Sequence, residues 1–261
     1  MKSKIAAAAL LLLPFTGQYA LAEEVAEEKS SFTISAELGM LFKTGNTKSG
    51  DIKAGLNIKH EAGRWLNSLA FNALAKKLET EDEFQSTDNK WDILGQSNYS
   101  LEEGGKNYLY GSAYYEQDKF SSFQYQTSAS FGWGRHWWET ETSSFFADIG
   151  PGVKYDVIRA SDATDTKLAM EEYSETAAIV QAQALYTKQI NDFVEFKQYF
   201  VAKQALESGK NSIYKSETSL TTKLMESLQF KFSFRVDYDT EVEQGFENTN
   251  TETSVTLVYN F

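Results

Sequence analysis

The given sequence closes with ETSVTLVYNF at residues 252–261, and this stretch gives the clearest indication of the fold. Apolar or aromatic side chains occupy alternate positions, which are Val255, Leu257, Tyr259 and Phe261. Most positions between and before them are polar, namely Glu252, Ser254, Thr256 and Asn260. Because successive side chains of a β-strand point to opposite faces, the alternation predicts a terminal strand with one apolar and one polar face.

A last strand with an aromatic, apolar face and a C-terminal Phe resembles the signal by which outer-membrane β-barrels are recognised for assembly. We therefore expect an assembly signal that is formed by Val255, Leu257, Tyr259 and Phe261. The partners that this expectation implies are outer-membrane lipid and the outer-membrane assembly machinery.

The N-terminus has the features of a secretory signal peptide. Lys2 and Lys4 precede an apolar run at 5–15, and Ala20-Leu21-Ala22 has the small-x-small pattern of a cleavage site. The run is shorter than the about 20 apolar residues that a transmembrane helix needs. The sequence therefore predicts a cleaved signal peptide at 1–22, an acidic segment at 23–30 and a single β-barrel domain at 31–261.

The composition favours a barrel in the bacterial outer membrane. The chain is 14% aromatic and has no Cys and two Pro, and its mean hydropathy is −0.45. A transmembrane barrel combines these properties because half of each strand faces a polar interior. Loss of Lys2 and Lys4 would change the formal charge from −12 to −14, which disfavours nucleic acid as a partner.

Alternation recurs along the chain and predicts an all-β, antiparallel transmembrane barrel of about twelve strands. Long acidic connections, expected at 79–88, 159–171 and 240–249, alternate with short turns at 61–63, 139–142, 189–192 and 225–227. An even strand number places both termini on one side of the membrane. A soluble β-sandwich is the alternative, but its strands are usually about 5 to 6 residues long, and they lack rims of Trp and Tyr.

Five short motifs of this sequence resemble motifs of one protein family. The motifs are Gly45-Asn46-Thr47, Gly63-Arg64-Trp65, Asp118-Lys119-Phe120, Gly150-Pro151-Gly152 and Val258-Tyr259-Asn260-Phe261. Their order and spacing resemble the YdiY-like family of salt-induced outer-membrane proteins, a domain family of unknown function. The resemblance covers about residues 31–261. It implies the outer membrane and a link to salt or envelope stress, and it supplies no functional residue.

Enzymatic chemistry has little support in the sequence. A lipid-modifying enzyme is one alternative, but the two histidines lack a readable Ser and acid partner. We expect His60 beside the tight turn at 61–63, and His136 on the lumen face near the opposite turn. The sequence has no Cys and no pair of His residues that would indicate a metal site. Acidic loops are usually solvated rather than bound to calcium. We predict no enzyme activity, no cofactor and no metal.

The expected inward positions carry acids and bases in nearly equal number. The candidate lumen-lining residues are Glu37, Asp51, Lys53, Lys90, Asp92, Asp148, Lys154, Asp156, Glu195, Lys197, Lys231, Arg235 and Asp237. Such a balance is typical either of ion pairs that fill the interior or of a narrow polar pore. We therefore expect a monomeric channel for ions or small hydrophilic solutes, with a non-conducting structural or envelope-stress barrel as the alternative.

Overall fold

The computed structural model describes residues 31–44, 49–76, 78–80, 83–85, 89–119, 121–160 and 171–261, and for 41–51 and 76–88 it describes no side chains. The predicted signal peptide, the acidic segment at 23–30, the Gly45-Asn46-Thr47 turn and most of the 159–171 loop lie outside these ranges. These remain predictions.

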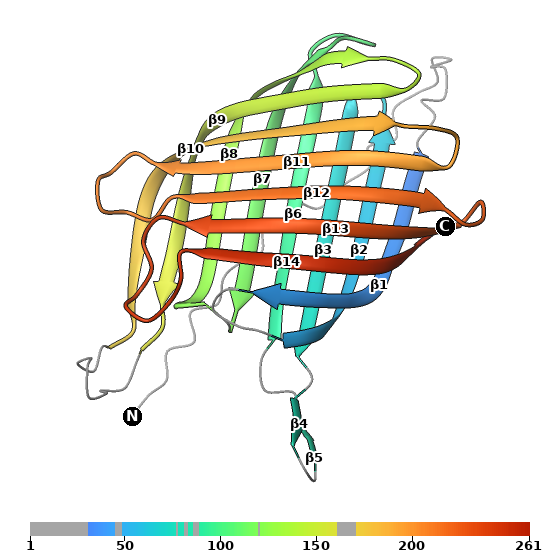
Figure 1. Cartoon of the computed structure of the whole chain (residues 1–261). Coiled ribbons are helices and arrows are strands. Elements are labelled where there is room, and N and C mark those ends of the chain that lie inside the picture. Colours follow the sequence, from blue (N-terminus) through green and yellow to red (C-terminus); the bar gives the residue numbers. More distant parts are fainter. Residues whose placement is uncertain are drawn as a thin grey trace, which may run out of the picture.

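Twelve antiparallel strands form one closed barrel (Figure 1). They are β1 (Ser31–Thr44), β2 (Ser49–Ala62), β3 (Trp65–Lys76), β6 (Asn89–Ser100), β7 (Asn107–Asp118), β8 (Phe123–Glu139), β9 (Ser143–Ile158), β10 (Tyr173–Gln189), β11 (Val194–Ala205), β12 (Ile213–Lys223), β13 (Leu228–Asp239) and β14 (Thr249–Asn260). Each pairs with its sequence neighbours, except that β3 pairs directly with β6. The predicted antiparallel barrel of about twelve strands is confirmed.

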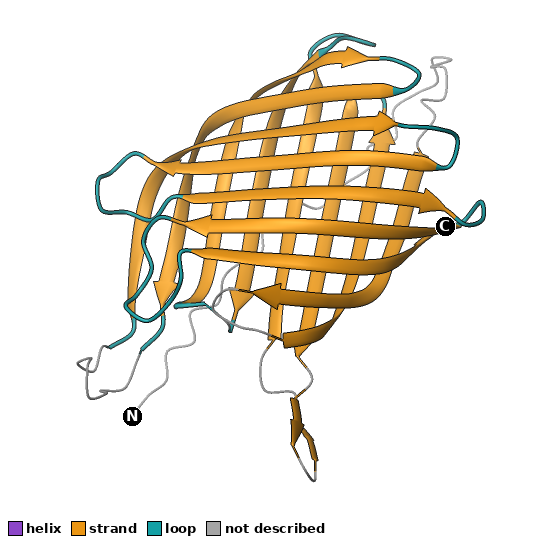
Figure 2. Cartoon of the chain, in the orientation of Figure 1, coloured by secondary structure: helices purple, strands orange, loops and turns teal. Residues whose placement is uncertain are grey.

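The first and last strands close the barrel. Leu38 on β1 pairs with Leu257 on β14 and with Ala54 on β2. Closure leaves no unpaired strand edge within the wall. The near-wall strands cross the far-wall strands steeply in Figure 1, because strands must tilt to close a barrel. Figure 2 shows the described wall to consist of strands and their connecting loops.

Alternation directs apolar side chains outward and polar side chains inward. On β13, Phe232 is 44% exposed, whereas the next residue, Ser233, is 2% exposed. Ser233 meets Ser254 of β14 across the strand pair, with 2.5 Å between the two hydroxyl oxygens. Large apolar side chains are exposed all around the wall, including those of Leu38, Phe71, Phe131, Ile149, Phe200 and Leu257. An apolar outer face with a polar interior reverses the arrangement found in soluble proteins, and it is typical of a barrel in lipid.

Two belts of aromatic side chains border the apolar outer face. One follows neighbouring strands and contains Trp91, Tyr115, Tyr125 and Tyr155, in which consecutive rings are 4.8 to 6.1 Å apart. The other lies at the opposite ends of the strands and contains Trp138, Phe145, Tyr186 and Phe196. Aromatic girdles of this kind mark both membrane interfaces in transmembrane barrels.

The two ends of the barrel differ in their connections. We call the end with connections 63–64, 101–106, 140–142, 190–193 and 224–227 the turn end. We call the other the loop end, with connections 45–48, 77–88, 119–122, 159–172, 206–212 and 240–248. The described ends of the barrel sequence both lie at the turn end, where Ser35 pairs with Asn260. This arrangement agrees with the predicted alternation of short and long connections.

The connection at 77–88 contains a short hairpin rather than only the predicted loop. Strand β4 (Leu78–Thr80) pairs with β5 (Glu83–Gln85), and the hairpin projects beyond the barrel wall (Figure 1). A long connection outside the wall still has backbone donors and acceptors to satisfy, and local pairing satisfies some of them. The acidic composition predicted the exposed position but not this pairing.

The turn motif Gly63-Arg64-Trp65 has a clear structural role. Gly63 has a φ of 56°, a left-handed conformation that glycine adopts without steric cost. Arg64 donates from Nε to the Ser100 carbonyl at 2.7 Å, and its guanidinium lies 4.5 Å from the centre of the Tyr99 ring. Trp65 packs against the same ring at 4.8 Å. The motif therefore joins the β2–β3 turn to the end of β6.

Candidate functional site in the barrel interior

The structure directs the described candidate residues toward the barrel interior but divides them among several groups. Glu195 and Lys197 lie near the turn end and form an ion pair of 2.7 Å. Lys154 and Asp156 form an ion pair on β9, and each side chain is 1% exposed. Asp51 lies on β2, but its side chain is outside the described set. The other candidates belong to the groups described next.

A cluster of ion pairs crosses the barrel near the loop end. We call it the paired layer, and it consists of Lys90, Glu116, Asp118, Lys215, Arg235, Asp237 and Glu252. The Lys90 ammonium lies 3.2 to 3.6 Å from a carboxylate oxygen of each of the four acids in the layer. One lysine therefore holds four carboxylates together.

The paired layer connects opposite walls. Lys90 is on β6 and its partner Asp237 is on β13, and four strands separate β6 from β13 along the shorter way around the barrel. Lys215 on β12 reaches Glu116 on β7 with a distance of 2.7 Å. Arg235 donates to the Asp237 carboxylate at 2.7 Å. The interior is thus bridged from wall to wall at this level.

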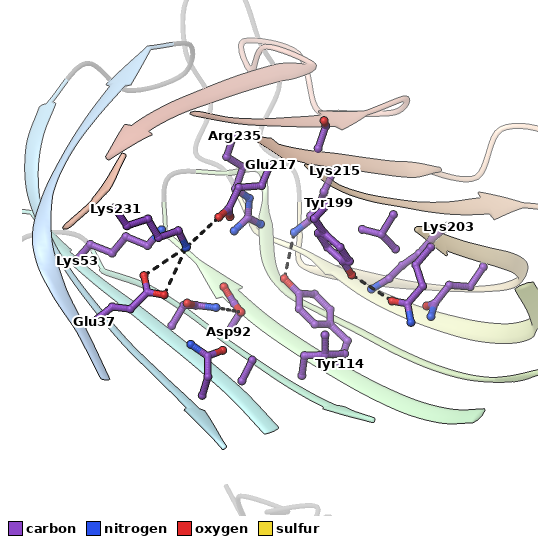
Figure 3. Close-up of a pocket in the computed structure, with 18 residues that line it drawn as sticks. Glu37, Lys53, Asp92, Tyr114, Tyr199, Lys203, Lys215, Glu217, Lys231 and Arg235 are labelled. Atoms are coloured by element: carbon purple, nitrogen blue, oxygen red, sulfur yellow. Dashed lines mark hydrogen bonds and ion pairs between the residues drawn. The ribbon is translucent and has the colours of Figure 1, made fainter. Parts of the chain in front are cut away.

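A cavity of about 240 Å³ adjoins the paired layer (Figure 3). Its charged lining residues are Glu37, Lys53, Asp92, Lys203, Lys215, Glu217, Lys231 and Arg235. Two tyrosines, Tyr114 and Tyr199, and the amides of Asn57, Asn72, Gln181 and Gln183 also line it. Lysines and arginine outnumber the carboxylates, so the near balance of the whole interior does not hold within this cavity.

Most charged groups of the cavity wall already have partners. Lys231 lies between Glu37, at 3.4 Å, and Glu217, at 3.2 Å (Figure 3). Asp92 accepts a hydrogen bond of 2.9 Å from the Asn72 amide. Such pairs remove the cost of burying these charges. They also leave Lys53 and Lys203 as the basic side chains with the fewest partners.

A network of amides and tyrosines fills the interior on the side of β6 to β10. The Gln183 amide donates to the Asp148 carboxylate at 2.8 Å and to the Gln96 carbonyl at 2.7 Å. Tyr108 donates to the same carboxylate at 3.2 Å. Asp148 is only 3% exposed, and these donors replace the lost water at Oδ2, one of its two carboxylate oxygens.

The interior charges differ in their exposure along the barrel. Near the turn end, the side chains of Glu195 and Lys197 are 30% and 45% exposed. Near the loop end, the Lys90 side chain is 8% exposed and that of Asp156 is 1% exposed. The charges of the paired layer are therefore among the least exposed of the described interior.

The alternation also predicts inward positions for Lys203, Lys215 and Glu217, and the structure places these three residues in the cavity lining. Two interior residues, both tyrosines, were missed. Tyr114 and Tyr199 line the cavity, but a search for charged residues passes over them. Their positions two residues from Glu116 and Lys197 were the available signal.

Both histidines lie at the turn end, so the expectation that His136 lies near the opposite turn was wrong. His136 pairs with Phe146, next to the 140–142 turn, because β8 runs toward the same end as β2. Its ring lies between those of Tyr108 and Phe146, and His60 stacks on Phe32 at 4.2 Å. Among the described residues, no group of three or more His, Cys, Asp or Glu side chains is placed to hold a metal ion.

Within the described ranges, the structure contains no helix that is both long and apolar enough to cross a membrane.

The fold resembles solved barrels, and the sequence resembles that of one curated protein. The NanC porin structure superposes with a TM-score of 0.51 at 11% identity, covering 86% of this chain and 98% of that one. The KdgM porin in complex with disordered oligogalacturonate gives 0.44 at 10% identity, with 87% and 99% covered. The likeness to NanC shows the fold alone.

One relative supports the resemblance seen in the sequence. The uncharacterized protein YdiY of Escherichia coli (strain K12) is 24% identical over 243 residues, which are 92% of this chain and 88% of that protein. The profile of the family described as "Protein of unknown function, DUF481" matches residues 36–261. The chain therefore belongs to the DUF481 family, as the resemblance to YdiY-like proteins predicted.

Proposed function

We propose that the protein is an outer-membrane channel of narrow bore for ions or small hydrophilic solutes. The observation that carries this proposal is a closed barrel with an apolar outer face and a charge-lined cavity of about 240 Å³ inside. A twelve-strand barrel lies between barrels of about eight strands, which side chains fill, and those of about 16 to 18, which hold an aqueous channel. The paired layer would be the constriction.

The proposal includes the location and the partners. The aromatic belts and the exposed apolar wall support a monomer that is inserted in the outer membrane. In this proposal, a cleaved signal peptide at 1–22 directs the chain to export. Leu257, Tyr259 and Phe261 are 48%, 45% and 77% exposed, so assembly machinery could contact them on the outer face. Induction by salt or envelope stress would be tested by measuring transcript levels at raised salt.

A non-conducting structural barrel is the second candidate. The cross-barrel ion pairs of Lys90 and Lys215 favour it, because they connect opposite walls where a pore would need a gap. In this view the charged interior would fix the register and shape of the barrel. The two functions differ in whether the folded protein conducts.

Planar bilayers distinguish the two candidates. We expect purified protein to conduct small ions, with a conductance well below that of large porins because of its narrow bore. Ala70 lines the cavity, so Ala70→Trp should reduce the conductance. Ala75, on the same strand, has the outward parity and is exposed, so Ala75→Trp is the matched control and should conduct as the parent does. A folded parent that conducts no more than lipid alone would contradict the channel.

A further inference from the structure

Two buried lysines face the cavity, and among the described side chains no carboxylate lies within ion-pair distance of either. Lys53 is 9% exposed and Lys203 is 5% exposed. Lys203 donates one hydrogen bond, of 2.8 Å, to the Ser128 hydroxyl, and its Nζ lies 3.9 Å from the centre of the Tyr114 ring. An ammonium group has three donors, so both lysines keep donors for a ligand.

The two lysines enter the cavity from opposite sides (Figure 3). Lys53 is on β2 and Lys203 on β11, and four strands lie between these along the shorter way around the barrel. The wall carboxylates have closer partners than these two lysines, because Lys231 lies 3.4 Å from Glu37 and 3.2 Å from Glu217, and Asp92 accepts a hydrogen bond from Asn72. Glu217 and Asp92 interact with Lys53 and Lys203, respectively, only over longer distances. A buried ammonium without a counter-charge is costly, and an anionic ligand would supply one.

The rest of the lining suits an organic anion better than a simple halide. Ala70, Leu94 and Val201 contribute apolar surface, and the Tyr114 and Tyr199 rings border the same space. Amides from Asn57 and Gln181 add hydrogen-bonding groups between the two lysines. A cavity of about 240 Å³ holds several non-hydrogen atoms rather than a single ion.

We infer that the cavity binds a small organic dicarboxylate, with one carboxylate directed to Lys53 and the other to Lys203. The inference rests on the proposed function, because it names the solute class of the same interior. Binding itself does not require conduction.

Isothermal titration with succinate tests the inference on the full barrel, folded in detergent micelles at low ionic strength. The parent should bind succinate saturably, bind acetate more weakly and leave the neutral analogue succinamide unbound. Lys53→Met and Lys203→Met keep most of the side-chain bulk and remove the charge. Each should weaken succinate binding about tenfold or more, since a charge-assisted hydrogen bond is lost, and the double variant should not bind.

Lys59→Met is the matched control, because Lys59 lies on the same strand and the same face as Lys53 but nearer the turn end and outside the cavity lining. It should leave the affinity within about twofold of the parent, as exposed charges contribute little. Heat-modifiable migration on gels verifies that each variant is folded. If Lys203→Met does not fold, Lys53→Met alone still decides.

Two results would overturn the inference: a folded parent that does not bind succinate, or binding that survives in the folded Lys53→Met variant. Bilayer conductance of the same preparation separates this failure from that of the channel. Binding without conduction would reject the channel and keep the anion site. Conduction without binding would keep the channel and reject the anion site.

Discussion

The paired layer and the cavity adjoin each other inside one barrel, and they differ in how closely their lysines are paired with carboxylates. In the paired layer, Lys90 contacts four carboxylates at 3.2 to 3.6 Å. In the cavity wall, Lys53 and Lys203 are equally buried but form no ion pair among the described side chains. A near balance of charge over a whole interior can therefore hide a densely paired region beside one that contains lysines without an ion pair.

The largest expected effect concerns the hub of the paired layer. Lys90→Met leaves four buried carboxylates without their common partner, so we expect the free energy of unfolding to fall by about 3 to 5 kcal/mol. Lys53→Met removes an unpaired ammonium and should cost about 1 kcal/mol or less. Urea unfolding in lipid vesicles, followed by tryptophan fluorescence, measures both. Equal losses in the two variants would mean that Lys90 is no more important for stability than Lys53.

A second substitution sharpens the same test. Adding Glu116→Gln to Lys90→Met removes one of the four repelling carboxylates, so part of the lost stability should return. The same Glu116→Gln change in the parent should itself destabilise, because it leaves Lys215 without its partner at 2.7 Å. If this double-mutant cycle shows no coupling energy between Lys90 and Glu116, the ion pair between these two residues does not stabilise the barrel.

The next effect tests whether the charges of both regions are tolerated only because they lie inside. Phe232 is on the outer face of the strand that carries Arg235 and Asp237 inside. Phe232→Arg should reduce the free energy of folding into lipid by about 2 to 4 kcal/mol, whereas Phe232→Leu keeps an apolar side chain and should cost much less. If both variants fold equally well, the assigned outer face would be wrong.

The smallest effect comes from salt. Raising the ionic strength from about 0.1 M to about 1 M shortens the screening length from about 10 Å to about 3 Å. Succinate binding should weaken several-fold, because salt anions compete with the free ligand for the lysines, whereas the stability difference between the parent and Lys90→Met should change little, because the buried Lys90 ion pairs are already formed at 3.2 to 3.6 Å. Titration and urea unfolding at both salt concentrations measure the two effects. A layer that loses its contribution at high salt would be solvent-exposed in solution.

Strand number, facing and the alternation of connections were predictable from the sequence because they depend on local pattern. Phe232 and Ser233 show the reason, since a period of two assigns faces without knowledge of any distant residue. The position of His136 was predicted wrongly because the end of the barrel at which a residue lies depends on counting strand directions. The β4–β5 hairpin was missed because its pairing segments are only three residues long.

By itself, the sequence determined that the chain forms a barrel with an apolar outside and a charged inside, because alternation sorts side chains to two faces. Only the tertiary structure decided which charges meet. Lys90 and Asp237 are 147 residues apart and sit on opposite walls. Their contact depends on closure, strand tilt and register together, and no local pattern records these. For the same reason, only the closed barrel distinguishes the paired Lys90 from the unpaired Lys53 and Lys203.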